Sequence, residues 1–151
     1  MINVDEFYMN EALKQARRAL KEDEVPVGCV IVTQKVIIAK AYNRCEGLCD
    51  PTAHAEMQAI TSACNSLKSK YLNDCTIYTT LEPCTMCAGA LFWSKIKSLV
   101  YGAADPKRPF SLLETKTLHP KTKIKNGVLA HECGSLLTSF FKKKRKLEQK
   151  F

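Results

Sequence analysis

The 151-residue sequence lacks any apolar run near the roughly 20 residues that a membrane-spanning helix requires. Residues 1–25 carry acidic side chains early and contain no continuous apolar stretch of the kind found in secretory signal peptides. The sequence also lacks internal repeats and low-complexity segments. These absences exclude the membrane-spanning and secreted classes. They predict a cytoplasmic protein with one domain over residues 1–151, which is long enough to bury a core.

Acidic residues are also scarce, with 15 Asp and Glu against 23 Lys and Arg, a formal net charge of +8. Much of the excess lies at the C-terminus, where residues 140–151 read FFKKKRKLEQKF and contain six basic residues against the single acidic Glu148. Such a segment is typical of surfaces that meet nucleic-acid phosphates. The alternative is a solvated helix end, where cations interact favourably with the helix dipole.

Eight cysteines in a chain without a secretory signal should remain mostly reduced. Four of them lie in apolar stretches, where a free cysteine behaves as a small hydrophobe: Cys29, Cys64, Cys75 and Cys133. Cys45 and Cys49 have metal-like spacing, but no further His or Cys pair is free to complete a site with them. The remaining pair, Cys84 and Cys87, belongs to the motif described below.

Hydrophobic periodicity predicts an α/β domain with the element order α-β-β-α-β-α-β, followed by a fifth strand and a last helix. The expected helices cover about 4–21, a segment from 54 to about 67, a segment from 84 to Trp93, and a segment that contains Leu136, Leu137, Phe140 and Phe141. The expected strands are Val27–Thr33, Val36–Tyr42, Cys75–Thr80, Lys97–Tyr101 and Lys123–Leu129. Residues 102–122 read as a long loop with one helical turn around Ser111–Thr115.

The connections predict how these elements assemble. The two-residue connection Gln34-Lys35 implies an antiparallel hairpin. Strands joined through helices should pair in parallel by right-handed crossovers, with the N-termini of the second and third helices at the carboxyl ends of their strands. This arrangement brings residues 54 and 84–87 together although about thirty residues separate them.

Those two segments have the composition of one zinc site, with His54-Ala55-Glu56 in the first and Pro83-Cys84-Thr85-Met86-Cys87 in the second. Catalytic zinc typically takes three protein ligands and keeps the fourth position for water. His54, Cys84 and Cys87 supply three ligands, and Glu56 is left for proton transfer. The pattern H-x-E…P-C-x-x-C is the signature of zinc nucleobase deaminases. A closed structural zinc site with another cysteine is the alternative, and it leaves no use for Glu56.

The stretches around these motifs resemble bacterial tRNA-specific adenosine deaminases, which convert the wobble adenosine of an anticodon to inosine and release ammonia. The matching stretches are EVPVGCVIV at 24–32, YNR at 42–44, DPTAHAEM at 50–57, LEPCTMCAGAL at 81–91 and GVLAHEC…SFF at 127–141. The resemblance implies a cytidine-deaminase-like fold, a three-layer α/β/α arrangement in which helices cover both faces of a five-stranded mixed sheet. It also implies one zinc per subunit, a tRNA anticodon stem-loop as substrate, and a homodimer whose site is completed near the subunit interface.

The resemblance further assigns roles to individual residues. It implies zinc ligands at His54, Cys84 and Cys87, a proton shuttle at Glu56, a nucleoside contact at Asn43, a base pocket lined by the backbone around Ala55 and Pro83-Cys84, and a nucleic-acid contact at Asp105. The chain departs from the family at Pro106–Phe110, where many members have a Lys-Thr-Gly segment. Trp93 also replaces a smaller or polar residue, and we expect it to pack in the core at a helix end.

Two other functions fit the same motifs. One is a zinc deaminase that acts on a free nucleobase or nucleoside, namely guanine, cytosine or adenosine, because motif spacing does not define substrate size. The basic tail and the stretches 42–44 and 50–56 favour RNA. The other is an RNA-binding module that zinc merely stabilises, and this alternative gives Glu56 no purpose.

Overall fold

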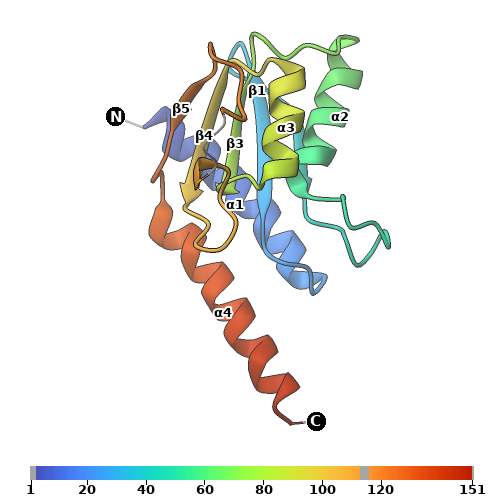
Figure 1. Ribbon diagram of the computed structural model, residues 1–151, viewed down its shortest axis with the longest axis vertical. Helices are drawn as coiled ribbons and strands as arrows, with labels where there is room; N and C mark the ends of the chain where they lie inside the picture. The colour runs from blue at the N-terminus through green and yellow to red at the C-terminus, as the bar shows by residue number, and fades with distance from the viewer. Residues whose placement is uncertain (1–2, 113–115, 151) are drawn as a thin grey trace.

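The computed structural model describes residues 3–112 and 116–150, which form a sheet with helices on both faces (Figure 1). The helices are α1 (Val4–Lys21), α2 (Ala55–Leu67), α3 (Thr85–Ser94) and α4 (Ala130–Glu148), with a 3-10 turn at Phe110–Leu112. The strands are β1 (Gly28–Thr33), β2 (Val36–Tyr42), β3 (Thr76–Leu81), β4 (Ser98–Ala103) and β5 (Lys123–Lys125). No helix among the described residues has the length and apolar character needed to cross a membrane.

The five strands lie in the order β2-β1-β3-β4-β5. The β1–β2 hairpin is antiparallel, as its two-residue connection predicts, and β3, β4 and β5 run parallel to one another. The expectation that helix-linked strands are neighbours holds for β3 and β4 but is wrong for β2 and β3, because β1 lies between them and pairs antiparallel to both. Because β1 is antiparallel to both neighbours, β2 and β3 run in the same direction, and their carboxyl ends lie at the same end of the sheet.

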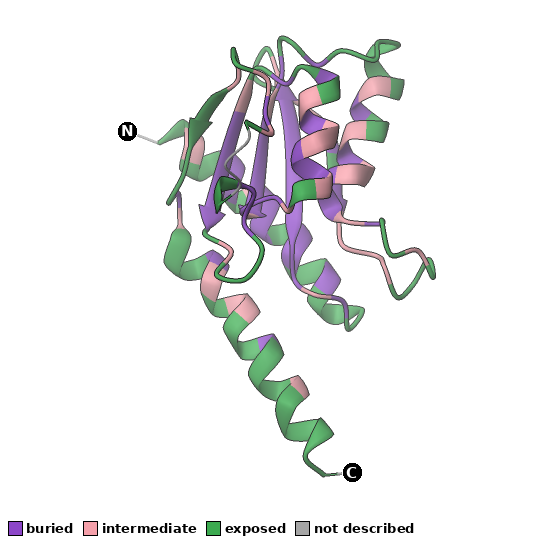
Figure 2. Ribbon diagram, in the orientation of Figure 1, coloured by how far each residue is buried: buried purple, intermediate pink, exposed green. Residues whose placement is uncertain are grey.

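Strand β1 faces two hydrophobic cores, one on each side of the sheet. Its Cys29 and Ile31 pack into the core beneath α2 and α3, whereas Val30 and Val32 pack into the core beneath α1 and the start of α4. Both faces of β1, β3 and β4 are therefore covered, and Figure 2 shows these strands as buried. The three-layer α/β/α fold with a mixed five-stranded sheet is confirmed.

Close contact between α1 and β1 depends on Gly28. A Cβ at this position would overlap the Ala12 carbonyl oxygen and the Ala16 nitrogen of α1. Ala12 and Ala16 are themselves fully buried, so small residues on both elements let the helix backbone approach the strand. Interiors packed this tightly do not accommodate an added methyl group without backbone movement.

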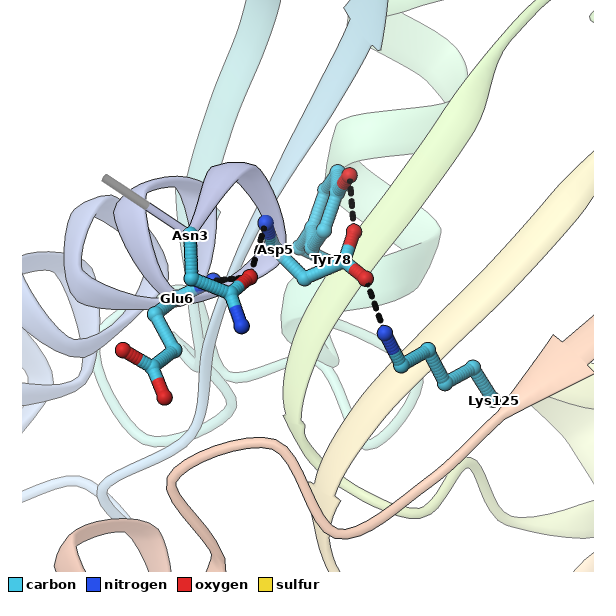
Figure 3. A network of polar contacts seen from close by, with 5 residues as sticks. All are labelled: Asn3, Asp5, Glu6, Tyr78 and Lys125. Atoms are coloured by element: carbon cyan, nitrogen blue, oxygen red, sulfur yellow. Dashed lines mark hydrogen bonds and ion pairs between the residues drawn. The ribbon is translucent and has the colours of Figure 1, made fainter. Parts of the chain in front are cut away.

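The N-terminus of α1 is joined to the sheet by a polar network (Figure 3). The Asn3 side chain caps the helix by accepting from the backbone N–H groups of Asp5 and Glu6. The Tyr78 hydroxyl of β3 donates to one Asp5 oxygen at 2.9 Å, and the Lys125 ammonium of β5 donates to the other. Burial raises the pKa of Asp5, but the hydrogen bonds from Lys125 and Tyr78 outweigh it and lower that pKa overall. The carboxylate therefore links α1, β3 and β5.

Three local expectations differ from the structure. The fifth strand covers only Lys123–Lys125, and all three of its residues are exposed. The helical turn lies at Phe110–Leu112, and residues 113–115 of the expected turn fall outside the described part of the chain. The expectation that Trp93 packs in the core is wrong, because its side chain is 78% exposed at the end of α3.

We predict that Gly28→Ala destabilises the protein by about 1–3 kcal/mol or more, because the new methyl group meets α1 backbone. Chemical denaturation monitored by circular dichroism measures the loss. Gly134→Ala is the matched control, since its added methyl group meets only Ala103 Cβ at 3.8 Å and alanine favours the helix. The control should gain about 0.5–1 kcal/mol. Equal stabilities for the two variants would contradict the role of Gly28.

Candidate active site

Two helix N-termini form the centre of the site. His54 is the N-cap of α2, and Cys84 is the N-cap of α3, with Cys87 in the first turn of the same helix. Neither N-cap side chain bonds to its own helix, so both project their donor atoms outward. His54 Nδ1 lies 3.6 Å from Cys84 Sγ and 3.5 Å from Cys87 Sγ, and the three atoms lie within 4.8 Å of one another. The structure thus brings together the three residues that the two motifs predict.

This donor set fits zinc. Zn–S bonds of about 2.3 Å and Zn–N bonds of about 2.0–2.1 Å at a tetrahedral angle place sulfur and nitrogen about 3.5–3.6 Å apart. The two observed separations, 3.6 and 3.5 Å, agree with that spacing. One imidazole and two thiolates also match the ligand preference of zinc, and three ligands leave one position open.

Electrostatics adds to the fit. The hydrogen bond from Cys87 and, to a smaller extent, the neighbouring His54 together lower the pKa of the Cys84 thiol to about 4, although burial opposes them. The same sulfur–sulfur contact, together with burial, raises the pKa of Cys87. The hydrogen bond with Cys84 raises the pKa of His54 despite burial of the ring. Cys84 is thus ionised beside a protonated Cys87, and a bound cation would allow both sulfurs to ionise.

Glu56 lies beside this cluster in the first turn of α2 and is only 4% exposed. Burial raises the pKa of its carboxyl group, which favours the protonated form. Among the described residues, its Oε1 is one of two buried side-chain polar atoms without a hydrogen-bond partner; the other is Arg44 Nε. A buried unpaired oxygen costs free energy, which suits a group that must accept and donate protons rather than hold the fold.

Asn43 and Ala55 contact each other directly. Asn43 follows β2, and its Oδ1 accepts the Ala55 N–H at 2.8 Å, which caps α2 in place of the outward-facing His54. The Ala55 N–H is therefore used inside the protein, and the Asn43 amide NH₂ is the part of that side chain left to meet a ligand. Ala55 itself is fully buried.

Pro83 and Asp105 lie on the other side of the cluster. Pro83 is buried directly before Cys84, and its carbonyl oxygen accepts the Phe110 N–H at 3.3 Å. Asp105 is partly exposed, and its Oδ1 accepts the backbone N–H groups of Lys107 at 2.8 Å and Arg108 at 3.2 Å. This side chain shapes its own loop and is not part of the three-donor cluster.

Sequence reasoning missed three side chains that hold the loops around the site. Gln58 donates to the Tyr42 and Ala53 carbonyl oxygens at 2.7 and 3.1 Å, and the buried carboxylates of Glu24 and Glu82 accept backbone N–H groups. Glu24 and Glu82 stand inside the stretches 24–32 and 81–91, but a carboxylate whose partners are backbone groups leaves no pattern of side-chain types to detect.

Comparison with known proteins agrees with this geometry. The family model described as "Cytidine and deoxycytidylate deaminase zinc-binding region" matches residues 2–103. The chain is 46% identical over 145 residues to the tRNA-specific adenosine deaminase of Aquifex aeolicus, covering 93% of this chain and 95% of that protein.

Two solved structures extend the comparison. One, from a study of A-to-I editing by tRNA:A34 deaminases, matches with a TM-score of 0.81 and 39% identity, covering 87% of this chain and 99% of that chain. The guanine deaminase of Bacillus subtilis matches with a TM-score of 0.63 and 40% identity, over 66% of this chain and 64% of that chain. The tRNA enzymes thus combine about 40% sequence identity or more with coverage of nearly the whole chain, whereas this guanine deaminase covers two thirds of it. The chain belongs to the cytidine and deoxycytidylate deaminase family, within its group of tRNA-specific adenosine deaminases.

Proposed function

We propose that the protein is a zinc-dependent hydrolase that deaminates adenosine to inosine at the wobble position of a tRNA anticodon and releases ammonia. The observation that carries the chemistry is the buried, unpartnered Glu56 oxygen beside the His54, Cys84 and Cys87 donor atoms. The choice of tRNA rests on similarity over nearly the whole chain to tRNA-specific adenosine deaminases.

His54, Cys84 and Cys87 would hold one zinc ion per subunit. Bound zinc supplies activation of water at neutral pH, because it lowers the pKa of a water ligand towards about 7. Glu56 takes the proton that the attacking water loses and delivers it to the ring nitrogen of adenine as carbon 6 gains the oxygen. Glu56 next takes the proton of the hydroxyl group now on carbon 6 and delivers it to the amino group, the C–N bond breaks, and ammonia leaves. Water thus supplies the oxygen of inosine, the hydrogen on its ring nitrogen and the third hydrogen of ammonia, so the reaction balances.

Substrate binding falls to the groups around that centre. The Asn43 amide would contact the target nucleoside, the backbone near Ala55 and Pro83 would line the base pocket, and Asp105 would approach the nucleic acid from the facing loop. The target base must be splayed out of its stack, which an anticodon loop permits more easily than a duplex.

The basic C-terminal segment is the proposed phosphate contact. It continues α4 to Glu148 and projects from the body of the domain (Figure 1). Lys144 forms an ion pair of 2.7 Å with Asp23, which lies just after the end of α1. We therefore do not count Lys144 among the proposed phosphate contacts. The exposed basic side chains that remain within α4 are Lys142, Lys143, Arg145 and Lys146.

A homodimer would cover apolar side chains that the single chain exposes on α2 and α3. Trp93 at the end of α3 is 78% exposed, and Leu67 at the end of α2 is 40% exposed. An indole this exposed is costly in water and is enriched at protein interfaces. We propose that the α2–α3 face meets a second copy of the chain, as the family resemblance implies.

Deamination of free guanine is the second candidate, because a guanine deaminase shares 40% identity with two thirds of the chain. We predict that the zinc-loaded protein converts adenosine in an anticodon stem-loop to inosine and releases little ammonia from guanine, cytosine or free adenosine. Glu56→Ala should retain about one zinc per chain and lose turnover by about 10²–10⁴, because the residue moves protons without ligating the metal.

Metal analysis and inosine chromatography measure these outcomes. His54→Ala is the control that should lose zinc and activity together. Zinc loss in Glu56→Ala would show that the roles are misassigned. Faster release of ammonia from guanine than from RNA would favour the free-base function, and no ammonia from any substrate would favour a non-catalytic RNA-binding module.

We predict that changing Lys142, Lys143, Arg145 and Lys146 to Gln weakens binding of a tRNA anticodon arm and flattens its salt dependence. Each lost phosphate contact should reduce the slope of log affinity against log salt by about 0.7–0.9. Base preference should hardly change, because phosphate contacts position RNA without reading it. Lys144→Gln is the matched control and should leave the slope unchanged. Equal slopes for the parent and the fourfold variant would leave the segment as a solvated helix end.

We predict that Trp93→Asp converts a dimer to a monomer, because it places a charge in the centre of the proposed interface. Sedimentation velocity at micromolar concentration measures the change. Val4→Asp is the control: Val4 is 61% exposed on α1, at the opposite face of the sheet, and its replacement should leave the dimer intact. A monomeric parent protein, or dimers in both variants, would contradict this interface.

A further inference from the structure

Glu82 stands between β3 and α3, two residues before Cys84, and is only 3% exposed. Among the described residues, the donors to its carboxylate come from one loop. Oε1 accepts the Asp105 N–H at 3.3 Å, and Oε2 accepts the Ser111 N–H at 3.2 Å and the Ser111 hydroxyl at 2.6 Å. The carboxylate thus holds both ends of the segment 105–111 against the turn that carries the cysteine ligands.

A buried carboxylate is stable only when hydrogen bonds replace its lost hydration. Three donors from one loop provide that replacement, and they order the loop in return. The Phe110 N–H adds a fourth bond to the same turn by donating to the Pro83 carbonyl at 3.3 Å. Loss of one acceptor oxygen would leave a loop N–H without its partner, so the loop would have to move to find water.

Glu24 repeats this arrangement on the opposite side of the cluster. It is 2% exposed, and its Oε1 and Oε2 accept the backbone N–H groups of Glu46 and Gly47 at 2.8 and 3.1 Å. These two residues belong to the loop 43–53, which begins at Asn43 and leads into His54, the N-cap of α2. Both loops lie at the end of the sheet where α2 and α3 begin (Figure 1).

We propose that Glu82 and Glu24 are positioning residues, each of which fixes one of the two loops that border the His54, Cys84 and Cys87 cluster. The structural part of this proposal stands without any substrate. Its kinetic part rests on the proposed function: Glu82 sets the position from which Asp105 approaches the RNA, and Glu24 does the same for the loop that follows Asn43.

The segment 105–111, which Glu82 holds, also approaches the C-terminal helix α4. Lys107 Nζ lies 5.8 Å from the centre of the Phe141 ring, so the Lys107 side chain reaches α4. Fixing this loop therefore also fixes the backbone from which Lys107 approaches α4. Neither Glu82 nor Glu24 is among the metal donors, and both act through the backbone of other residues.

Hydrogen–deuterium exchange of the zinc-loaded protein tests the structural part. In Glu82→Gln, an NH₂ group replaces one acceptor oxygen and faces a donor. Exchange in residues 104–112 should accelerate by about tenfold or more, while exchange in residues 44–48 stays at the parent rate. Glu24→Gln is the matched control and should show the reverse pattern. Parent-like exchange in both loops of both variants would overturn the proposal, as would acceleration of both loops in each variant.

Ser111→Ala keeps the proposal testable if Glu82→Gln fails to fold or to hold zinc. It removes the hydrogen bond from the Ser111 hydroxyl to Glu82 and leaves Glu82 itself, two residues before Cys84, unchanged. Exchange in residues 104–112 should again rise with zinc content unchanged. If Glu82→Gln folds, the double variant should exchange no faster than Glu82→Gln alone, because both changes break one linkage. Additive acceleration would overturn the assignment.

Kinetics on an anticodon stem-loop tests the second part. Glu82→Gln should raise KM by about tenfold and change kcat less, because a displaced loop weakens binding without altering Glu56 or the metal donors. A fall in kcat at constant KM would overturn the positioning role. If the parent protein deaminates no RNA while the exchange patterns are as expected, the proposed function fails and the two loop anchors stand.

Discussion

The N-termini of α2 and α3 meet at one end of the sheet, and the rest of the site depends on this convergence. A helix N-terminus offers unpaired N–H groups and a positive dipole end, so it favours ionised sulfur and a nearby carboxylate. His54 and Cys84 are both N-cap residues whose side chains leave their own helices uncapped. At α2, the Asn43 side chain provides the missing cap by accepting the Ala55 N–H. The fold therefore stabilises the start of α2 from a neighbouring segment and leaves the His54 side chain free for a metal.

Local patterns were enough to predict most elements and the metal cluster. The range predicted for α1 agrees with Val4–Lys21, and the start predicted for α2 agrees with its N-cap at His54. The order of the strands in the sheet was harder to predict, because periodicity indicates which face of a strand is buried but not which strand lies beside it. The insertion of β1 between β2 and β3 leaves no local signal, although it preserves the strand direction on which the site depends.

Errors at single residues have a common physical origin. Trp93 reads as a core residue by hydrophobicity, yet its position on the outer side of α3 exposes it. In the sequence, Lys144 is one of six basic residues in the C-terminal segment, yet its place on α4 directs it to Asp23. The sequence predicted no role for Glu24 and Glu82, yet they are buried because loop backbone groups supply their hydrogen bonds. Each outcome depends on the tertiary neighbour, which composition and spacing do not contain.

The short fifth strand has a consequence for how the protein behaves at high concentration. An edge strand presents unpaired backbone groups that can recruit a strand from another molecule and begin a fibril. Here the edge is three residues long, and Ile124 stands between the exposed side chains of Lys123 and Lys125. A strand approaching this edge would gain few hydrogen bonds and would meet the exposed Lys123 side chain beside the Lys125–Asp5 ion pair. The short, lysine-flanked β5 thus opposes growth of the sheet at this edge, while β2 forms the other edge.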